Sequence, residues 1–115
     1  MNKPLALKKT DTIRSAFKTL SGEFGMIICI ISNDDVLTGV VTEGDLRRAI
    51  LKGFSLDTKL EEVQNVNPFY VYESELNAKK IVKSKIYPGI NPEIGSQPLI
   101  CPIVDKNKRL LNILN

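Results

Sequence analysis

The stretch Gly39–Gly53, GVVTEGDLRRAILKG, holds the end of one secondary-structure element and the whole of the next. Up to Thr42 the sequence is apolar and β-branched, which favours a strand over Val36–Val41. After Thr42 the apolar residues recur at helical spacing, and Gly53 is a typical residue just past a helix end. The stretch therefore predicts a strand that leads directly into a helix over about residues 43–52.

Upstream of this stretch, the apolar pattern predicts a second strand and a first helix. Met26–Ile31 is a nearly continuous apolar run, typical of a strand buried on both faces. The polar cluster Asn33–Asp35 separates this run from the next strand, so the two form a hairpin. Thr12–Leu20 places its apolar residues at helical spacing, with Asp11 or Thr12 as the N-cap.

Downstream of Gly53 the same order of elements begins again. A polar connection over residues 54–68, with a helical turn at Leu60–Val63, leads to this second set. The predicted elements are a strand at Phe69–Tyr72, a helix at Leu76–Ile86, a loop at Tyr87–Pro98, and hairpin strands at Leu99–Val104 and Leu110–Leu114.

The two hairpins align with each other, which predicts an internal repeat. Allowing one extra turn residue, Ile28, Cys29, Ile31, Leu37, Val40 and Val41 fall on Ile100, Cys101, Ile103, Leu110, Ile113 and Leu114. We predict an N-terminal tail over residues 1–8, of which Met1–Ala6 contribute little to stability, then a first repeat over 9–66 and an incomplete second repeat over 67–115. Asn115 takes the position of Thr42, so either the second repeat lacks its closing helix or the chain is a fragment.

The composition describes one ordinary globular domain, and the predicted elements place it in the α+β class. With 16 basic and 13 acidic side chains, the net charge is +3 over 115 residues. The basic residues are spread without interleaved aromatic residues, which argues against a nucleic-acid partner. No apolar run reaches the roughly 18 residues of a membrane span, so we expect no membrane partner and a cytoplasmic location.

The side chains present exclude several kinds of chemistry. The chain has no histidine, which removes triad hydrolysis and His-ligated metal sites, and we predict no catalytic residue and no metal. Cys29 and Cys101 lie inside apolar runs, which is typical of buried reduced thiols. The adjacent carboxylates Asp34–Asp35 and Glu61–Glu62 have no nucleophile or base near them in sequence. This chain by itself is therefore not predicted to be an enzyme.

A repeated unit of helix, strand, strand and helix, with GVVTEGD at the strand-to-helix junction, resembles the CBS domain, a module that occurs as tandem pairs. The resemblance covers about residues 9–115 and implies two β-hairpin-plus-helix repeats about a pseudo-twofold axis. Gly39–Gly53 and Val66–Val71 are most similar to pairs attached to sugar-phosphate nucleotidyltransferases. The resemblance therefore implies that the chain is a nucleotide-sensing regulatory module of a larger enzyme of that type, such as one similar to a mannose-1-phosphate guanylyltransferase.

The resemblance also implies a ligand, an adenosine-type nucleotide, with no cofactor required. In such pairs a Thr and an Asp at the positions of Thr42 and Asp45 hold the phosphate and the ribose. The base lies between the start of the module and the first hairpin strand, which points to Thr12, Ile28, Ile100 and Pro102. The residues also permit another interpretation, in which Thr42 and Asp45 form a helix cap and the isoleucines are core.

A second function hypothesis needs no ligand. The chain would then be a structural or dimerisation module, a homodimer formed through the helical face of Leu46, Ala49, Ile50 and Leu51. Titration with nucleotides separates the two hypotheses, because a ligand-free module gives no heat of binding.

Overall fold

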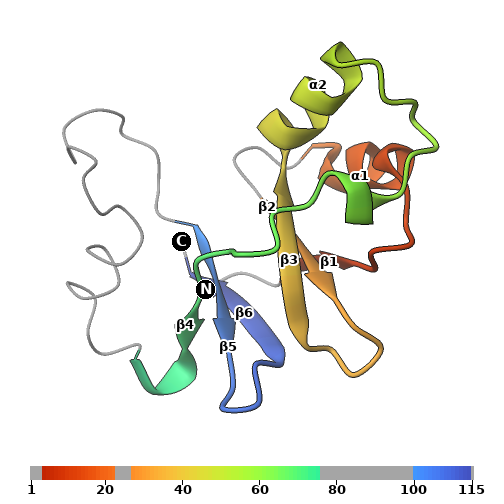
Figure 1. Cartoon of the computed structure of the whole chain (residues 1–115). Helices are drawn as coiled ribbons and strands as arrows, with labels where there is room; N and C mark the ends of the chain where they lie inside the picture. The colour runs from red at the N-terminus through yellow and green to blue at the C-terminus, as the bar shows by residue number, and fades with distance from the viewer. Residues whose placement is uncertain (1–3, 23–26, 76–99, 115) are drawn as a thin grey trace, which may run out of the picture.

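The computed structural model describes residues 4–22, 27–75 and 100–114, which form two three-stranded sheets with helices packed on the first (Figure 1). The first repeat contains β1 (Leu5–Leu7), α1 (Ile13–Leu20), β2 (Ile27–Ile31), β3 (Leu37–Thr42), α2 (Glu43–Leu51) and the short 3-10 helix η1 (Leu60–Glu62). The second contains β4 (Val71–Tyr72), the 3-10 helix η2 (Glu73–Glu75), β5 (Cys101–Val104) and β6 (Leu110–Leu114). The helix predicted at Leu76–Ile86 and the loop predicted at Tyr87–Pro98 lie outside the described residues.

The two sheets have the same topology. In the first, β1 runs parallel to β2, and β2 pairs with β3 as an antiparallel hairpin. In the second, β4 runs parallel to β5, and β5 pairs with β6 in the same antiparallel way. The predicted hairpins and the predicted α+β class with two repeats are confirmed.

β1 corrects the prediction for the N-terminal tail. Leu5 pairs with Ile28 and Leu7 pairs with Ile30, so this short strand forms one edge of the first sheet. Both leucines also pack against the core between the sheet and the helices. The expectation that Met1–Ala6 contribute little is therefore wrong at Leu5 and Ala6, which pair with Ile28 and Cys29. A run of three residues is too short to show a periodic pattern, and its strand conformation depends on pairing with β2.

The strand registers also correct the predicted alignment of the repeats. The register shifts between Ile30 and Ile31 in the first hairpin, and between Ile103 and Val104 in the second. Ile30 thus corresponds to Ile103, and no extra turn residue is needed. Ile28 corresponds to Cys101 rather than to Ile100, so the predicted register was wrong by one position in this strand. An apolar run buried on both faces has no alternation that could fix its register.

The turns of the two hairpins have the same internal bonding. In the first turn, Ser32 Oγ accepts hydrogen bonds from the backbone N–H groups of Asp34 and Val36. In the second, Asp105 Oδ1 accepts from the corresponding backbone N–H groups two and four residues further on. Asp35 and Lys108 occupy equivalent positions, and each has φ of 65°, in the left-handed region.

Hydrogen bonds join the two turns reciprocally. The backbone N–H of Leu37 donates to the carbonyl of Lys108 at 2.9 Å, and the N–H of Leu110 donates to the carbonyl of Asp35 at 2.9 Å. Leu37 corresponds to Leu110, and Asp35 corresponds to Lys108, so each bond is the counterpart of the other. Such an exchange is the relation that a pseudo-twofold axis between the repeats produces.

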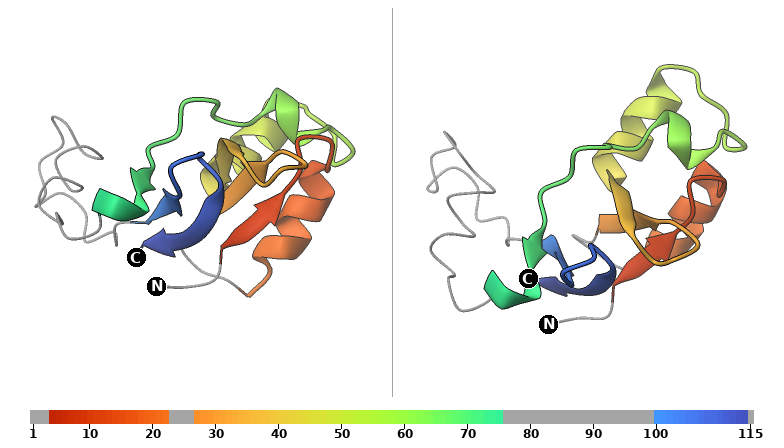
Figure 2. Two further views of the ribbon diagram at one scale, coloured as in Figure 1. Left: turned by 90° about the horizontal axis from the view of Figure 1, so that it is seen from below. Right: turned by 60° about the horizontal axis from the view of Figure 1, so that its bottom comes forward.

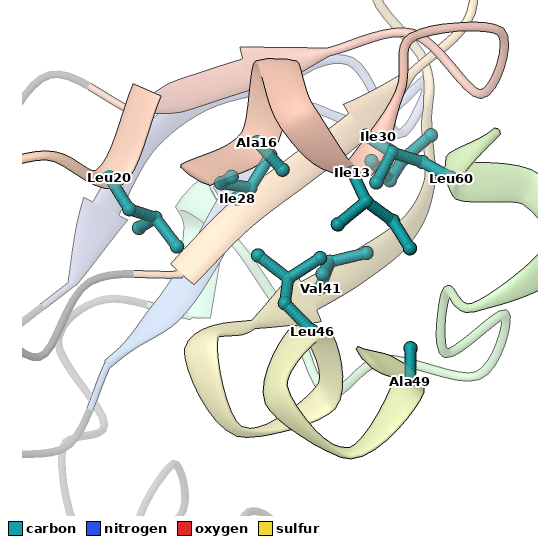
Figure 3. Close-up of a cluster of buried hydrophobic side chains, with 9 residues drawn as sticks. All are labelled: Ile13, Ala16, Leu20, Ile28, Ile30, Val41, Leu46, Ala49 and Leu60. Carbon is teal, nitrogen blue, oxygen red and sulfur yellow. The ribbon is translucent and has the colours of Figure 1, made fainter. Parts of the chain in front are cut away.

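Two clusters of apolar side chains form the core. The first lies between the first sheet and its helices (Figure 3) and consists of Ile13, Ala16, Leu20, Ile28, Ile30, Val41, Leu46, Ala49 and Leu60. The second joins the two sheets through Cys29, Leu37, Val40, Val104 and Ile113. Figure 2 shows the second sheet on the side of the first sheet away from α1. Alternate residues of β2 therefore face different clusters, as expected for a strand buried on both faces.

Within the ranges that the structure describes, none of the helices is both long and apolar enough to span a bilayer.

Candidate functional site

Thr42 and Asp45 form a reciprocal pair of hydrogen bonds where β3 meets α2. Thr42 is the N-cap residue, and its Oγ1 accepts from the backbone N–H of Asp45 at 3.1 Å. Asp45 Oδ2 accepts from the backbone N–H of Thr42 at 3.0 Å. This capping box satisfies two N–H groups that a helix start leaves without intrahelical partners. The interpretation of both residues as a helix cap is therefore confirmed.

Arg48 binds the other oxygen of the same carboxylate. Its Nη2 donates to Asp45 Oδ1 at 2.6 Å in an ion pair three residues apart on α2. The Asp45 side chain is 27% exposed and the Arg48 side chain is 65% exposed, so the pair borders solvent. Spacing of three residues was a usable sequence signal for this pair, and the prediction from sequence missed it.

The missing side chain of Gly44 leaves room for the Arg48 guanidinium. A Cβ atom at Gly44 would lie 3.3 Å from Arg48 Nη1 and 3.7 Å from Thr42 Oγ1. The space beside Gly44 is therefore next to the guanidinium group. The Arg48 side chain therefore gives a structural reason for glycine at position 44, in addition to any role in ligand binding.

Gly39 has a different neighbour. A Cβ atom there would collide with Gln64 Oε1 and lie 3.0 Å from the carbonyl oxygen of Asn65. Asn65 exchanges two backbone hydrogen bonds with Val40, so the connection after α2 runs along the free edge of β3. Gln64 Oε1 is buried and has no hydrogen-bond partner among the described residues. The close approach of this segment, which the sequence did not predict, accounts for glycine at position 39.

The other four predicted site residues contribute to the core, to the cap of α1 or to the second sheet. Ile28 is fully buried in the first core cluster, which confirms its interpretation as a core residue. Thr12 caps α1 through its Oγ1, which accepts from the Ser15 N–H. Ile100 packs against the cluster between the sheets, and Pro102 is buried in β5.

The strand registers separate Thr12 from Thr42. Thr42 lies beside Ile27 at the start of β2. Thr12 follows β1, whose last residue Leu7 lies beside Ile30 toward the other end of the same strand. Thr42 and Asp45 are thus the two predicted site residues that the structure joins by hydrogen bonds.

A hollow of about 480 Å³ lies on the second repeat, away from Thr42 and Asp45. Its described lining is Tyr72, Glu73, Ser74, Asp105 and Lys106. Because it is open and contains none of the predicted site residues, we place the candidate site at the capping box instead.

The two cysteines are free thiols inside the protein, as the sequence predicted. Burial raises the pKa of Cys29 from 9.0 to about 12, with a smaller contribution from the neighbouring Cys101. Burial also raises the pKa of Cys101 from 9.0 to about 11. Both thiols therefore stay protonated, and poor nucleophiles, at neutral pH.

These raised pKa values predict a loss of stability in alkali. The unfolded chain ionises its thiols above pH 9.0, whereas the folded protein keeps them protonated until about pH 11 to 12. The contribution is therefore present below pH 9.0 and is lost as the pH rises. By about pH 10 each thiol should cost about 1 kcal/mol of unfolding free energy. Denaturant titrations at about pH 8 and about pH 10 measure it, and an equal fall in Cys29→Ala would contradict it.

Known proteins resemble this chain both over its first repeat and over nearly its full length. Residues 1–52 match the family model of the CBS domain. The arabinose 5-phosphate isomerase KdsD of Francisella tularensis is 28% identical over 109 residues. That match covers 94% of this chain and 30% of the isomerase, so the chain spans less than a third of the length of this relative.

Solved structures resemble the chain over its whole length. A CBS domain protein from Pyrobaculum aerophilum complexed with AMP has a TM-score of 0.72 at 22% identity, covering 100% of this chain and 82% of that one. A CBS domain pair in complex with 5'-methylthioadenosine and S-adenosyl-L-methionine has a TM-score of 0.74 at 21% identity, covering 100% and 87%. Residues 1–52 thus match the CBS domain family, and the chain as a whole has the fold of a CBS domain pair.

Proposed function

We propose that this chain is the nucleotide-sensing regulatory module of a larger enzyme, and that Thr42 and Asp45 contact an adenosine-type nucleotide. The observation that carries the proposal is a partly exposed Thr-Asp pair at a helix start in the fold of a CBS pair. Structural relatives of that fold contain AMP or S-adenosyl-L-methionine.

The physical chemistry of the helix start supports each contact. The first turn of α2 presents backbone N–H groups and the positive end of the helix dipole, both of which favour a phosphate. The Asp45 carboxylate, 27% exposed, is available to accept hydrogen bonds from ribose hydroxyls. Regulation then requires only that the ligand prefer one arrangement of the pair by about 1–3 kcal/mol.

The substitution Asp45→Asn tests the ribose contact. We expect it to weaken AMP binding about tenfold in calorimetric titration, because one charge-assisted acceptor is lost. The melting temperature should change little, because Thr42 Oγ1 still caps the helix and an asparagine oxygen can still accept from the Thr42 N–H. Glu43→Gln is the matched control, since it removes the same charge from the same exposed first turn. Equal AMP affinity in wild type and Asp45→Asn would contradict the role.

A second candidate function is a structural or dimerisation module without ligand. The capping box favours it, because Thr42 and Asp45 satisfy each other with no ligand present. The predicted interface needs correction, however. Leu46 and Ala49 are buried in the first core cluster and are not part of an exposed face. The apolar side chains exposed around the end of α2 are Ile50, Leu51, Phe54 and Leu56.

We propose that this corrected surface forms a homodimer. Leu51 is 80% exposed and has Ile50, Phe54 and Leu56 near it in sequence, and an exposed patch of apolar side chains is typical of an interface between proteins. The substitution Leu51→Glu should shift the protein to monomer in sedimentation at tens of micromolar, with the melting temperature of the monomer unchanged. Leu111→Glu on β6, where the leucine is 42% exposed, is the control and should leave the assembly intact. A wild-type monomer at high micromolar concentration would refute this surface.

We also propose that the attached catalytic domain acts on a sugar phosphate. The sequence resemblance narrows this to a nucleotidyltransferase, whereas the relative KdsD is a sugar-phosphate isomerase. The coding sequence on either side of this chain decides between them. A glycine-rich nucleoside-triphosphate loop would support the transferase, and a domain similar to the rest of KdsD would support the isomerase.

A further inference from the structure

Arg48 binds the acceptor that the proposed ribose contact needs. Asp45 Oδ2 is committed to the helix cap through the Thr42 N–H at 3.0 Å. Asp45 Oδ1 is the oxygen outside the cap, and Arg48 Nη2 binds it at 2.6 Å. A ribose hydroxyl that donates to Oδ1 therefore meets an oxygen that the guanidinium group already binds.

The position of the guanidinium is set by Gly44 and Asp45 rather than by the helix dipole. A Cβ atom at Gly44 would lie 3.3 Å from Arg48 Nη1 and 3.7 Å from Thr42 Oγ1. A cation at the start of a helix is opposed by the positive end of the dipole, so the Asp45 carboxylate must hold it there. The Arg48 side chain is 65% exposed and takes no part in either core cluster. It can therefore leave Asp45 without disturbing the packing of the first repeat.

We propose that Arg48 is a specificity-determining residue that competes with ribose for Asp45 and makes the site select nucleotides over nucleosides. This inference rests on the proposed function. A nucleoside must displace the guanidinium and offers it no new partner. A nucleotide offers its phosphate, which matches the planar fork of donors on arginine. The same side chain thus opposes adenosine and favours AMP.

The test compares wild type, Arg48→Gln and Arg47→Gln for binding of adenosine and AMP. Arg47 is the matched control, because it is exposed on the same helix and forms no ion pair with the residues described. Arg48→Gln should bind adenosine about 2- to 5-fold more tightly, the range expected for loss of an exposed ion pair. It should bind AMP no more tightly than wild type does, so the AMP-to-adenosine selectivity falls. Arg47→Gln should resemble wild type for both ligands.

The salt dependence of adenosine binding distinguishes this competition from a purely structural role of Arg48. Adenosine is uncharged, so salt acts on its affinity mainly by screening the Asp45–Arg48 ion pair. Wild-type affinity for adenosine should rise between low and high salt, and the affinity of Arg48→Gln should stay constant.

The outcomes separate the inference from the function on which it rests. If wild type binds AMP but Arg48→Gln binds adenosine equally or more weakly, the competition is refuted and the nucleotide site stands. If neither protein binds AMP or adenosine at millimolar concentration, the proposed function fails, and the inference fails with it.

Discussion

Replacing Leu60 by alanine should lower the free energy of unfolding by about 2–5 kcal/mol, the usual cost of a cavity at a fully buried leucine. Leu60 has no exposed surface and belongs to the first core cluster, which also contains Ile13 and Ile30. Its backbone N–H donates to the carbonyl of Asp11 at 2.8 Å, so η1 is fastened to the segment before α1. The connection after α2 is therefore part of the first repeat's core. Chemical denaturation followed by circular dichroism measures the effect.

Leu51→Ala is the control for this substitution. Leu51 is 80% exposed, so the same change of side chain should alter the stability of the monomer by no more than about 0.5 kcal/mol. Equal effects of the two substitutions, measured below the dimerisation range, would show that η1 does not belong to the core.

Gly39→Ala should cost about 1–3 kcal/mol, the range typical of overpacking. The new Cβ would collide with Gln64 Oε1, and the Asn65 carbonyl at 3.0 Å cannot retreat without weakening the bonds to Val40. Gly44→Ala is the comparison at a second glycine of the same motif. Its Cβ would meet the end of the flexible Arg48 side chain at 3.3 Å, and alanine favours a helix, so stability should not fall.

A second substitution separates the two contacts at Gly39. In a Gln64→Ala background the collision with Oε1 is gone, so Gly39→Ala should cost less there than in wild type. The part of the cost that remains belongs to the Asn65 backbone. Strict additivity of the two substitutions would mean that Gln64 does not lie over Gly39.

The elements that could be predicted from the sequence are those whose apolar residues are spaced by the burial of one face. α1 and α2 have apolar residues at helical spacing with a Thr cap before each, and the structure begins both helices directly after Thr12 and Thr42. Strands β2 to β6 were predicted from their apolar runs, and the helical turn at Leu60 was predicted as well. Such patterns show which face of an element is buried, so they can be recognised without knowing which element packs against that face.

Features that depend on a partner were not predictable. β1 is a strand because Leu5 and Leu7 pair with β2, and nothing within three residues encodes this. The register of the repeats was predicted one position out in the first strand, because Ile28–Ile31 is apolar at almost every position. Likewise, the approach of Gln64 to Gly39 joins residues far apart in sequence.

For the candidate site, the sequence identified the two capping partners but not Arg48, which binds one of them. Thr42 and Asp45 were predicted both as a cap and as ligand contacts, and the structure confirms the cap. The ligand role stays a prediction, because one pair of side chains suits both purposes. Arg48 was given no partner within the chain from the sequence, although its spacing from Asp45 permitted the ion pair that the structure contains.

Backbone amide chemical shifts of the ¹⁵N-labelled protein, followed during titration with AMP, test the nucleotide site most directly. The largest shift changes should fall on the amides of Thr42, Glu43, Gly44 and Asp45, whose N–H groups begin α2. They should saturate with AMP and weaken in Asp45→Asn. Unchanged shifts at millimolar AMP, or changes confined to the hollow beside Tyr72 and Asp105, would contradict a nucleotide site at the start of α2.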